Sequence, residues 1–499
     1  MSTKSYHQVD DDENEKVIVV TTADNSNNID SSNSEQDEAK KRVAKSINIM
    51  VLTVFLQSIG FTVMMPSMYD YLEWIRPSFG DYNGWVVAVY SAGQFLSSPF
   101  FGYWSNKRDA REPLIVSIII SIVGNILYAI VYKFNGKAVI IMAIARFIVG
   151  IGAGNVSVCR AFASEVSDIS SKTTTMAKMG AAQGAGFVLG PAIGYALAYC
   201  NFHIKDLVIN EYTAPGYLSV LFAFANITAI LIAFKDTRDI KSRLEKEKID
   251  IETAKANSNS TGVKRPWYYQ KNQKLLPIFV SIFLFAIVIS IFAVFETILT
   301  ELTKRYYNWE VKQNGYILGG TGILSIVVFV VISLPFIKKF DDRKMVIFGF
   351  ANLTVALLFL ANYGKPFNWE TDLPLWQFII GSVFVSIGYP IASSLIYAIF
   401  SKVLNPTSQG TKMGWLTAGG SLARMLGPIW AQSIWNKCNQ EGMVLFLVTA
   451  SISVVAIITL IVFFRKLDPH PDYKPPTPPP PKTTSINADE YDESKPLLN

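Results

Sequence analysis

Twelve long apolar stretches constrain this 499-residue chain more than any other feature of its sequence. A helix needs about twenty apolar residues to cross the hydrocarbon core of a bilayer. Unpaired backbone polar groups are not tolerated in lipid, so stretches of this length indicate spanning helices and not open strands. We place the spans at residues 46–66, 85–104, 114–132, 138–158, 176–199 and 215–234, and then at 276–298, 314–335, 345–362, 375–398, 411–434 and 443–464.

The composition agrees with a membrane protein. Half of the residues are apolar and only 17% are charged, whereas a soluble domain carries about a quarter charged residues. The three cysteines have no spacing typical of a disulfide framework or a metal site. The sequence contains no nucleophile–base pair and no phosphate-binding loop. We therefore expect no enzyme, no metal, no cofactor and no nucleic-acid partner, and we expect an all-α membrane protein whose surroundings are the lipid bilayer.

The basic residues predict the orientation of the spans. Lys and Arg cluster before the first span and after alternate spans, as in Lys107, Arg108 and Arg111, and such clusters favour the cytosolic side. Both tails and the central insert should then be cytosolic. This gives the following organisation: residues 1–45 a disordered tail, 46–234 a six-helix bundle, 235–275 a cytosolic loop, 276–465 a second six-helix bundle, and 466–499 a disordered tail.

The two halves repeat three short features in the same order. The first half contains Phe147–Gly150, Lys178–Gly180 and Gly190-Pro191, and the second contains Phe378–Gly381, Lys412–Gly414 and Gly427-Pro428. Parallel six-span repeats are typical of transporters that bind their solute between the halves. Chance recurrence of Gly-Pro pairs in apolar helices is the alternative.

Three motifs in the first half resemble those of the major facilitator superfamily. The loop after the second span contains Gly102, Asn106, Lys107 and Arg111, with Asn106 where the family usually has an acid. The fourth span contains Arg146 and Gly150. The fifth contains Gly186, Gly190, Pro191 and Gly194. The resemblance implies twelve spans in two halves, a latch between the halves at the second-to-third loop, and a hinge at the Gly-Pro kink. An ordinary basic loop is the alternative for the first motif.

Two arginines fall deep inside the expected spans. Arg146 belongs to the first half and Arg424 to the second, three residues before Gly427-Pro428. Charge at membrane depth is costly and must face protein or water. If both side chains face one cavity, that cavity should bind an anion. Otherwise each arginine pairs with Glu296 or with backbone carbonyls and never meets solute.

Other polar residues inside the spans are weaker candidates. Gln57 and Gln183 could line the cavity with the arginines, and Gln94 is a similar case, although hydrogen bonds between helices explain them equally well. Glu296 is a candidate for proton coupling.

The C-terminal tail contains a candidate sorting signal. Glu493 precedes Leu497 and Leu498 by four and five residues. The pattern is similar to the dileucine signals that clathrin adaptors bind, which predicts delivery to endosomal or lysosomal membranes. With this tail, residues 46–465 resemble a lysosomal branch of the superfamily, and that resemblance implies an anion permeability, with chloride suggested.

Three functional hypotheses remain open from the sequence. The first is a facilitator that moves a small anion across the endolysosomal membrane, by a carrier or a channel-like mechanism. The second is a proton-coupled carrier of an organic anion or another small metabolite. The third is a scaffold or receptor that transports nothing and works through its tails.

Overall fold

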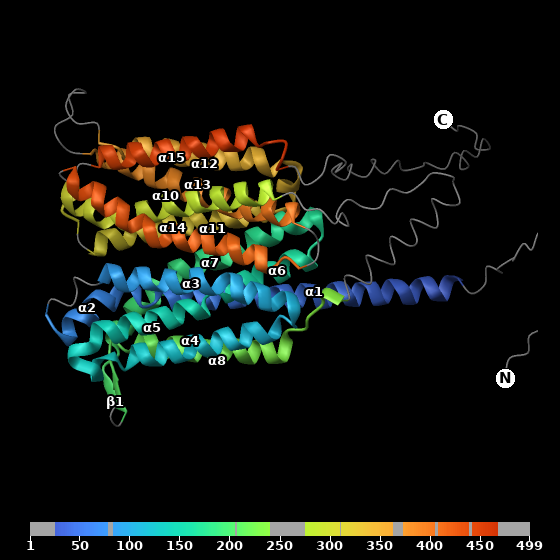
Figure 1. Cartoon of the computed structure of the whole chain (residues 1–499), viewed down its shortest axis with the longest axis horizontal. Coiled ribbons are helices and arrows are strands. Elements are labelled where there is room, and N and C mark those ends of the chain that lie inside the picture. The colour runs from blue at the N-terminus through green and yellow to red at the C-terminus, as the bar shows by residue number, and fades with distance from the viewer. Residues whose placement is uncertain are drawn as a thin grey trace, which may run out of the picture.

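The computed structural model describes residues 25–77, 83–204, 207–239, 275–309, 311–362, 373–404, 408–438 and 442–467. Long helices lie side by side along one direction and form almost all of the described structure (Figure 1). The helices of the first half are α1 (Asn25–Thr62), α2 (Met65–Ile75), α3 (Asn83–Lys107), α4 (Arg111–Ala129), α5 (Ala138–Gly152), α6 (Asn155–Val166), α7 (Lys172–Ala196) and α8 (Ala214–Ala233). Those of the second half are α10 (Leu276–Tyr307), α11 (Val311–Ile332), α12 (Asp342–Leu360), α13 (Leu375–Val403), α14 (Gly410–Lys437) and α15 (Met443–Val462).

These helices form the twelve expected spans. α1 continues into α2 as one span and α5 continues into α6 as another, so each half contains six. Nine of the described spans are apolar enough to be recognised as membrane helices by composition alone. The other three are α3, α7 and α14, which are richer in small and polar residues. The prediction of an all-α fold with twelve spans is confirmed.

The remaining elements are short. β1 (Phe202–Ile204) and β2 (Leu207–Ile209) pair antiparallel between α7 and α8, and this hairpin projects from one end of the bundle (Figure 1). The 3-10 helices are Val131–Lys137, Ile169–Ser171, Leu197–Tyr199 and Pro335–Lys339.

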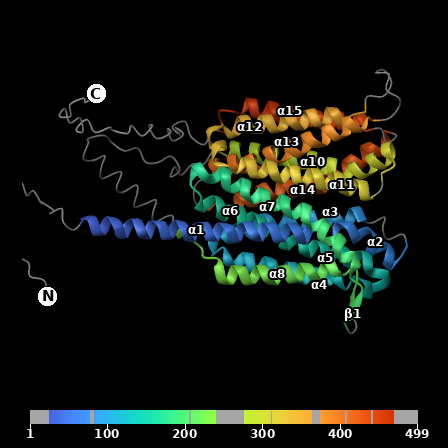
Figure 2. The ribbon, with the colours of Figure 1, turned by 180° about the vertical axis from the view of Figure 1, so that it is seen from behind.

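Both halves begin and end at the same end of the bundle, which we call the proximal end. There the Ser46 hydroxyl, at the entry of α1, donates to the carbonyl of Lys235, just beyond α8. Arg343, at the start of α12, donates to the carbonyl of Phe464, just beyond α15. The hairpin of β1 and β2 marks the opposite, distal end (Figure 2).

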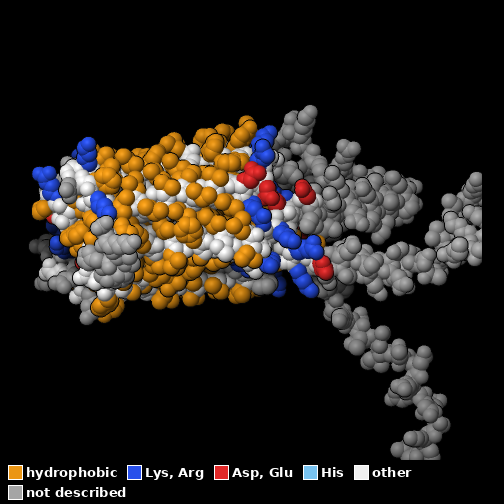
Figure 3. All heavy atoms as spheres, turned by 90° about the horizontal axis from the view of Figure 1, so that it is seen from below, with side chains coloured by type: hydrophobic (Ala, Val, Ile, Leu, Met, Phe, Trp, Pro, Cys, Tyr) orange, Lys and Arg blue, Asp and Glu red, His pale blue; other side chains and the backbone are white. Residues whose placement is uncertain are grey.

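The surface of the bundle matches a bilayer. Hydrophobic side chains cover its middle, and charged side chains gather at its two ends (Figure 3). Exposed apolar residues such as Leu221, Ile232 and Val462 would be unfavourable in water but are suited to lipid. The bundle therefore spans the membrane along its long axis.

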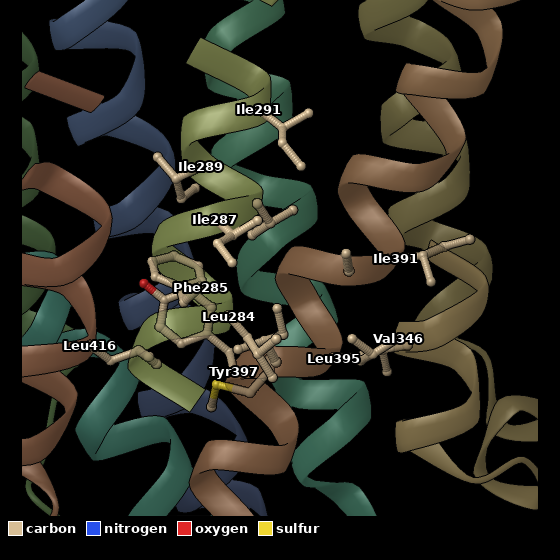
Figure 4. Close-up of a cluster of buried hydrophobic side chains, with 14 of the residues drawn as sticks. Leu284, Phe285, Ile287, Ile289, Ile291, Val346, Ile391, Leu395, Tyr397 and Leu416 are labelled. Carbon is tan, nitrogen blue, oxygen red and sulfur yellow. The ribbon is translucent and has the colours of Figure 1, made fainter. Parts of the chain in front are cut away.

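The two halves pack in the same way, as a repeat requires. In the first half α7 packs on α1, and in the second half the corresponding α14 packs on α10. Between the halves α3 packs on α14 and, in the equivalent position, α11 packs on α7. Figure 4 shows α10 in the core of the second half, where Phe285 meets Tyr397 of α13 with ring centroids 4.5 Å apart.

Some helices are longer than the sequence predicts. α1 begins at Asn25 and not near residue 46, so the part of the tail between residues 25 and 45 is helical where disorder was expected. An ion pair one turn apart, Glu38 with Arg42 at 3.1 Å, supports this extension. The fourth span continues to Val166 where residue 158 was expected, and this difference matters for the site.

Candidate functional site

A cavity lies between the two halves near the middle of the bundle. Its walls come from α1, α3, α6 and α7 of the first half and from α10, α11, α13 and α14 of the second, and it encloses about 890 Å³, its open mouth included. Aromatic rings, hydroxyls and amides form most of the lining. Two arginines, Arg160 and Arg424, contribute charge, and none of the described lining residues is acidic. The cavity therefore carries a net positive charge.

Arg424 reaches the cavity from α14 and rests against aromatic rings. Its guanidinium carbon lies 5.3 Å from the ring centre of Phe187 and 5.8 Å from that of Phe61, and both rings belong to the other half. Within the described part of the chain no carboxylate forms an ion pair with it. Cation–π contacts stabilise the charge only weakly. Arg424 is thus available to a negatively charged solute.

Arg160 provides the second charge, from α6. Its Nη2 donates to Oε1 of Gln183 at 2.5 Å, and its guanidinium carbon lies 3.5 Å from the ring centre of Tyr397, across the interface between the halves. The side chain is only 5% exposed, and its Nε has no hydrogen-bond partner in the described structure. Gln183 thus orients the guanidinium and leaves a donor free.

Arg146 does not line this cavity, so the expectation that Arg146 and Arg424 face one space does not hold in this conformation. Arg146 is 0% exposed, and the rings of Phe61 and Tyr90 stand beside it with centres 5.5 Å and 4.9 Å from its guanidinium carbon. Both of these residues line the cavity. The aromatic pair therefore separates Arg146 from the solute space.

The glutamines and Glu296 occupy different positions. Gln57 and Gln183 line the cavity, as does Gln94. Gln94 also joins the halves, because its Oε1 accepts a hydrogen bond from Ser421 at 2.9 Å. Glu296 is outside the lining, but it lies on the same face of α10 as Phe285 and Ile289, and it is exposed. The side of α10 that lines the cavity is therefore exposed at Glu296, toward the distal end.

Tyr389 lies near both cavity arginines and Glu296. It lines the cavity from α13, and its hydroxyl lies within electrostatic range of Arg160, Arg424 and Glu296. Its ring stacks on Phe292 with centroids 4.1 Å apart. A hydroxyl placed among these groups can donate a hydrogen bond to a bound anion.

The proximal side of the cavity is closed by contact between α3 and α14. A Cβ added at Gly102 would overlap the backbone of Gly410, so only glycine allows this approach. Asn106 accepts from the backbone N–H of Gly410 at 2.8 Å and donates to the Thr411 hydroxyl at 2.9 Å. An amide at position 106 thus caps the N-terminus of α14 without a charge and joins the two halves.

A charged cluster supports this closure. Glu165 of α6 accepts from the backbone N–H of Gln409 at 2.5 Å and pairs with Arg238 at 3.4 Å. Arg238 also pairs with Asp236 at 2.6 Å. Burial alone would raise the pKa of Asp236, but the hydrogen bonds and charge of Arg238 outweigh it and hold that pKa below its usual 3.8. Asp236 therefore stays ionised at neutral pH.

Two basic residues of the loop, Lys107 and Arg111, do not join the halves. Lys107 is exposed, with its Nζ 5.9 Å from the ring centre of Tyr103. Arg111 donates to the carbonyl of Phe234 at 2.7 Å and so caps the end of α8 within the first half.

The motif glycines bring neighbouring helices close together. Gly150 packs on the backbone of Tyr90 in α3, and Gly427 packs on Ala293 of α10. In α7, Gly186, Gly190 and Gly194 face the end of α1, where added Cβ atoms would overlap Ser58, Thr62 and Val63. Pro191 and Pro428 lie inside α7 and α14.

The comparisons with known proteins identify the family. The Major Facilitator Superfamily model matches residues 47–361 and 278–489. The curated relatives include major facilitator superfamily domain-containing protein 8 of Xenopus laevis, which is 31% identical over 85% of this chain and 92% of its own length. The chain belongs to the major facilitator superfamily.

Solved structures of superfamily members share the fold. The human organic anion transporter MFSD10 (TETRAN) superposes with a TM-score of 0.66 at 18% identity, covering 84% of this chain and 99% of its own. The proton:xylose symporter XylE superposes with a TM-score of 0.69 at 14% identity, covering 86% and 96%. Such low identities support the fold and not the substrate. This chain is a transporter of the superfamily.

Arg160 is not identified as a cavity residue from the sequence, because the expected fourth span ends at residue 158. The sequence places residue 160 just past the expected end of the fourth span, where a basic residue reads as part of a cytosolic loop. In the structure all twelve residues of α6 are buried, so the helix continues inside the bundle. The low charge of the stretch from Val156 to Ser164 is the signal that would have shown it. The sorting-signal residues Glu493, Leu497 and Leu498 lie outside the described residues.

Proposed function

We propose that this transporter carries a small organic anion between the two sides of the membrane by alternating access. The observation that supports the proposal best is the pair of guanidinium groups, Arg160 from one half and Arg424 from the other, in a cavity whose described lining has no carboxylate. An anion bound between them would draw the halves together, and rocking of the halves about it would expose it to either side in turn.

The lining favours an organic anion over chloride. Phe187, Tyr389 and Tyr397 offer rings on which an apolar group can pack. The name of the human neighbour, an organic anion transporter, agrees with this preference. Chloride rests on the resemblance to the lysosomal branch alone.

Glu296 is the candidate for proton coupling within this proposal. It is exposed on the distal part of the α10 face that lines the cavity, and it lies within electrostatic range of Arg424. A carboxylate there could take up a proton when an anion occupies Arg424. Carriage of a proton with the anion would then depend on Glu296.

Flux into proteoliposomes tests the proposal. We expect uptake of a radiolabelled organic anion, with Arg424→Gln and Arg160→Gln each lowering uptake at least about tenfold, because a hydrogen bond to a charged group contributes on the order of 1.5–3 kcal/mol. Arg42→Gln is the matched control, since Arg42 is exposed at the proximal end of α1, far from the cavity lining, and pairs with Glu38.

Four results would contradict the proposal or its parts. Uptake unchanged in both cavity variants would remove the role of the arginines. Chloride flux without any organic anion flux would favour the halide. Unchanged flux under an imposed pH gradient in wild type and Glu296→Gln alike would remove proton coupling. Absence of any flux would favour the scaffold hypothesis.

We also propose an endolysosomal location with cytosolic tails, reached through a clathrin adaptor that binds Glu493, Leu497 and Leu498. The sequence pattern and the basic proximal end support this assignment. Replacement of Leu497 and Leu498 by alanine should move a fluorescently tagged protein from lysosomes to the cell surface. Unchanged lysosomal fluorescence would reject the signal.

A further inference from the structure

Arg146 is a buried cation that has no acidic partner among the described residues. The groups within its electrostatic range are the phenols Tyr90 and Tyr128, which are neutral at pH 7. In the described structure its Nε and Nη2 have no hydrogen-bond partner, and Nη1 contacts only the Met64 sulfur at 3.4 Å, a weak acceptor. A buried charge left in this way costs several kcal/mol. This cost indicates that Arg146 has a function other than packing.

The Phe61 ring stands between this cation and the cavity. Its centre lies 5.5 Å from the guanidinium carbon of Arg146 and 5.8 Å from that of Arg424. The ring also packs on Tyr90, with centroids 4.4 Å apart. One aromatic side chain thus contacts two cations and separates a closed space from an open one.

The backbone next to Phe61 is interrupted. α1 ends at Thr62, one residue beyond the ring, and the same span resumes as α2 at Met65. The α7 glycines Gly186, Gly190 and Gly194 pack closely against this break, where an added Cβ would overlap Ser58, Thr62 or Val63. A helix end next to a break can change its backbone angles at lower cost than a continuous helix, and discontinuous spans at mid-membrane are used for binding in transporters.

We propose that Phe61 is a movable partition and that Arg146 forms a concealed anion subsite, which joins the central cavity when this ring turns. The free Nε and Nη2 donors of Arg146 would then face the space that Arg160 and Arg424 already line. The inference rests on the proposed function and extends it, because it assigns the substrate two negative groups: one held between Arg160 and Arg424, and a second bound at Arg146.

Succinate and butyrate are suitable probes, because they have the same number of carbons and differ in charge. We expect purified wild-type protein to bind succinate more tightly than butyrate in isothermal titration. Arg146→Gln should weaken succinate binding about tenfold, as expected for loss of a hydrogen bond between charged groups, and should leave butyrate binding unchanged.

Opening the partition should have the opposite effect. Phe61→Ala removes one of the two rings that separate Arg146 from the cavity and should tighten succinate binding, and this gain should disappear in the Phe61→Ala/Arg146→Gln double variant. Phe100→Ala is the matched control, because Phe100 lies outside the cavity lining and packs on Phe101 and Trp104. Phe61→Leu, which keeps most of the bulk, serves if the alanine variant does not elute as a single species, and it should give a smaller gain.

Each outcome decides between the two proposals. A gain in the Phe61 variants that requires Arg146 supports the partition. Anion binding that depends on Arg160 and Arg424 but ignores Phe61 and Arg146 overturns the partition and leaves the proposed function standing. Absence of binding of either anion to any variant overturns both.

Discussion

Asn106 joins the two halves through both ends of its amide. Its oxygen accepts from the backbone N–H of Gly410 and its nitrogen donates to the Thr411 hydroxyl. A carboxylate at this position could make the first bond but could not donate the second. The neutral amide is therefore a suitable latch where two helices meet closely and where an unpaired charge would be costly.

Removal of this amide should loosen the proximal closure. Asn106→Ala loses two hydrogen bonds at a helix N-terminus, which together contribute about 1–3 kcal/mol, so the proximally open population should rise about tenfold. The rate at which a membrane-impermeant thiol reagent, added from the proximal side, labels a cysteine placed at Thr417 measures this population. The background would carry serine at Cys200 and Cys438.

Asn352→Ala is the control for that experiment. Asn352 is also buried, but in the described part of the chain its side chain bonds to the carbonyl of Phe348 in its own helix and not to the other half. Equal labelling rates in the Asn106 and Asn352 variants would mean that the Asn106 bonds do not hold the halves together.

At the scale of elements, glycines set how closely α7 and α1 pack. A Cβ at Gly190 would overlap the Thr62 side chain and approach the backbone of Val63, whereas a Cβ at Gly319 of α11 would meet nothing within 4 Å. Alanine should thus lower stability at Gly190 but not at Gly319.

We expect Gly190→Ala to lower thermal stability, because overpacking of a close helix contact costs about 1–3 kcal/mol. Gly319→Ala should leave stability unchanged or raise it by up to about 1 kcal/mol, since alanine is the better helix former. Thermal unfolding of the purified proteins in one detergent compares them directly. A melting temperature for Gly190→Ala equal to or above that of wild type would contradict the packing argument.

The elements themselves were largely predictable, because hydropathy over some twenty residues identifies a span without knowledge of its neighbours. The lining of the cavity was not. Arg146 and Arg160 lie on the same span about four helical turns apart, and no local pattern shows that one is sealed by Phe61 while the other faces the solute. That distinction depends on side chains from α1 and α3, which tertiary packing brings to the site.

At the scale of the whole molecule, the halves meet tightly at the proximal end. Besides the α3–α14 contact, Thr173 of α7 donates to Asp342 at 3.1 Å and Lys172 donates to the carbonyl of Ser401 at 2.6 Å. These contacts join α7 to the second half, whereas the first contact joins α3 to α14. The structure thus represents a conformation that is closed on the proximal side.

The Asp236–Arg238 pair of this closure should not respond to mild acid. Arg238 holds the pKa of Asp236 below its usual 3.8. A carboxyl whose pKa is lower in the folded than in the unfolded state stabilises the structure above the unfolded pKa, and this contribution is lost only as the pH falls through the folded pKa. Between pH 7 and pH 5 the pair therefore remains ionised.

We expect spin labels on the proximal ends of α3 and α14 to show that Asp236→Asn opens the closure equally at pH 7 and at pH 5. The opposite result would be a closure that loosens between pH 7 and pH 5 in the wild type but not in Asp236→Asn. That result would show that this carboxylate is the acid sensor.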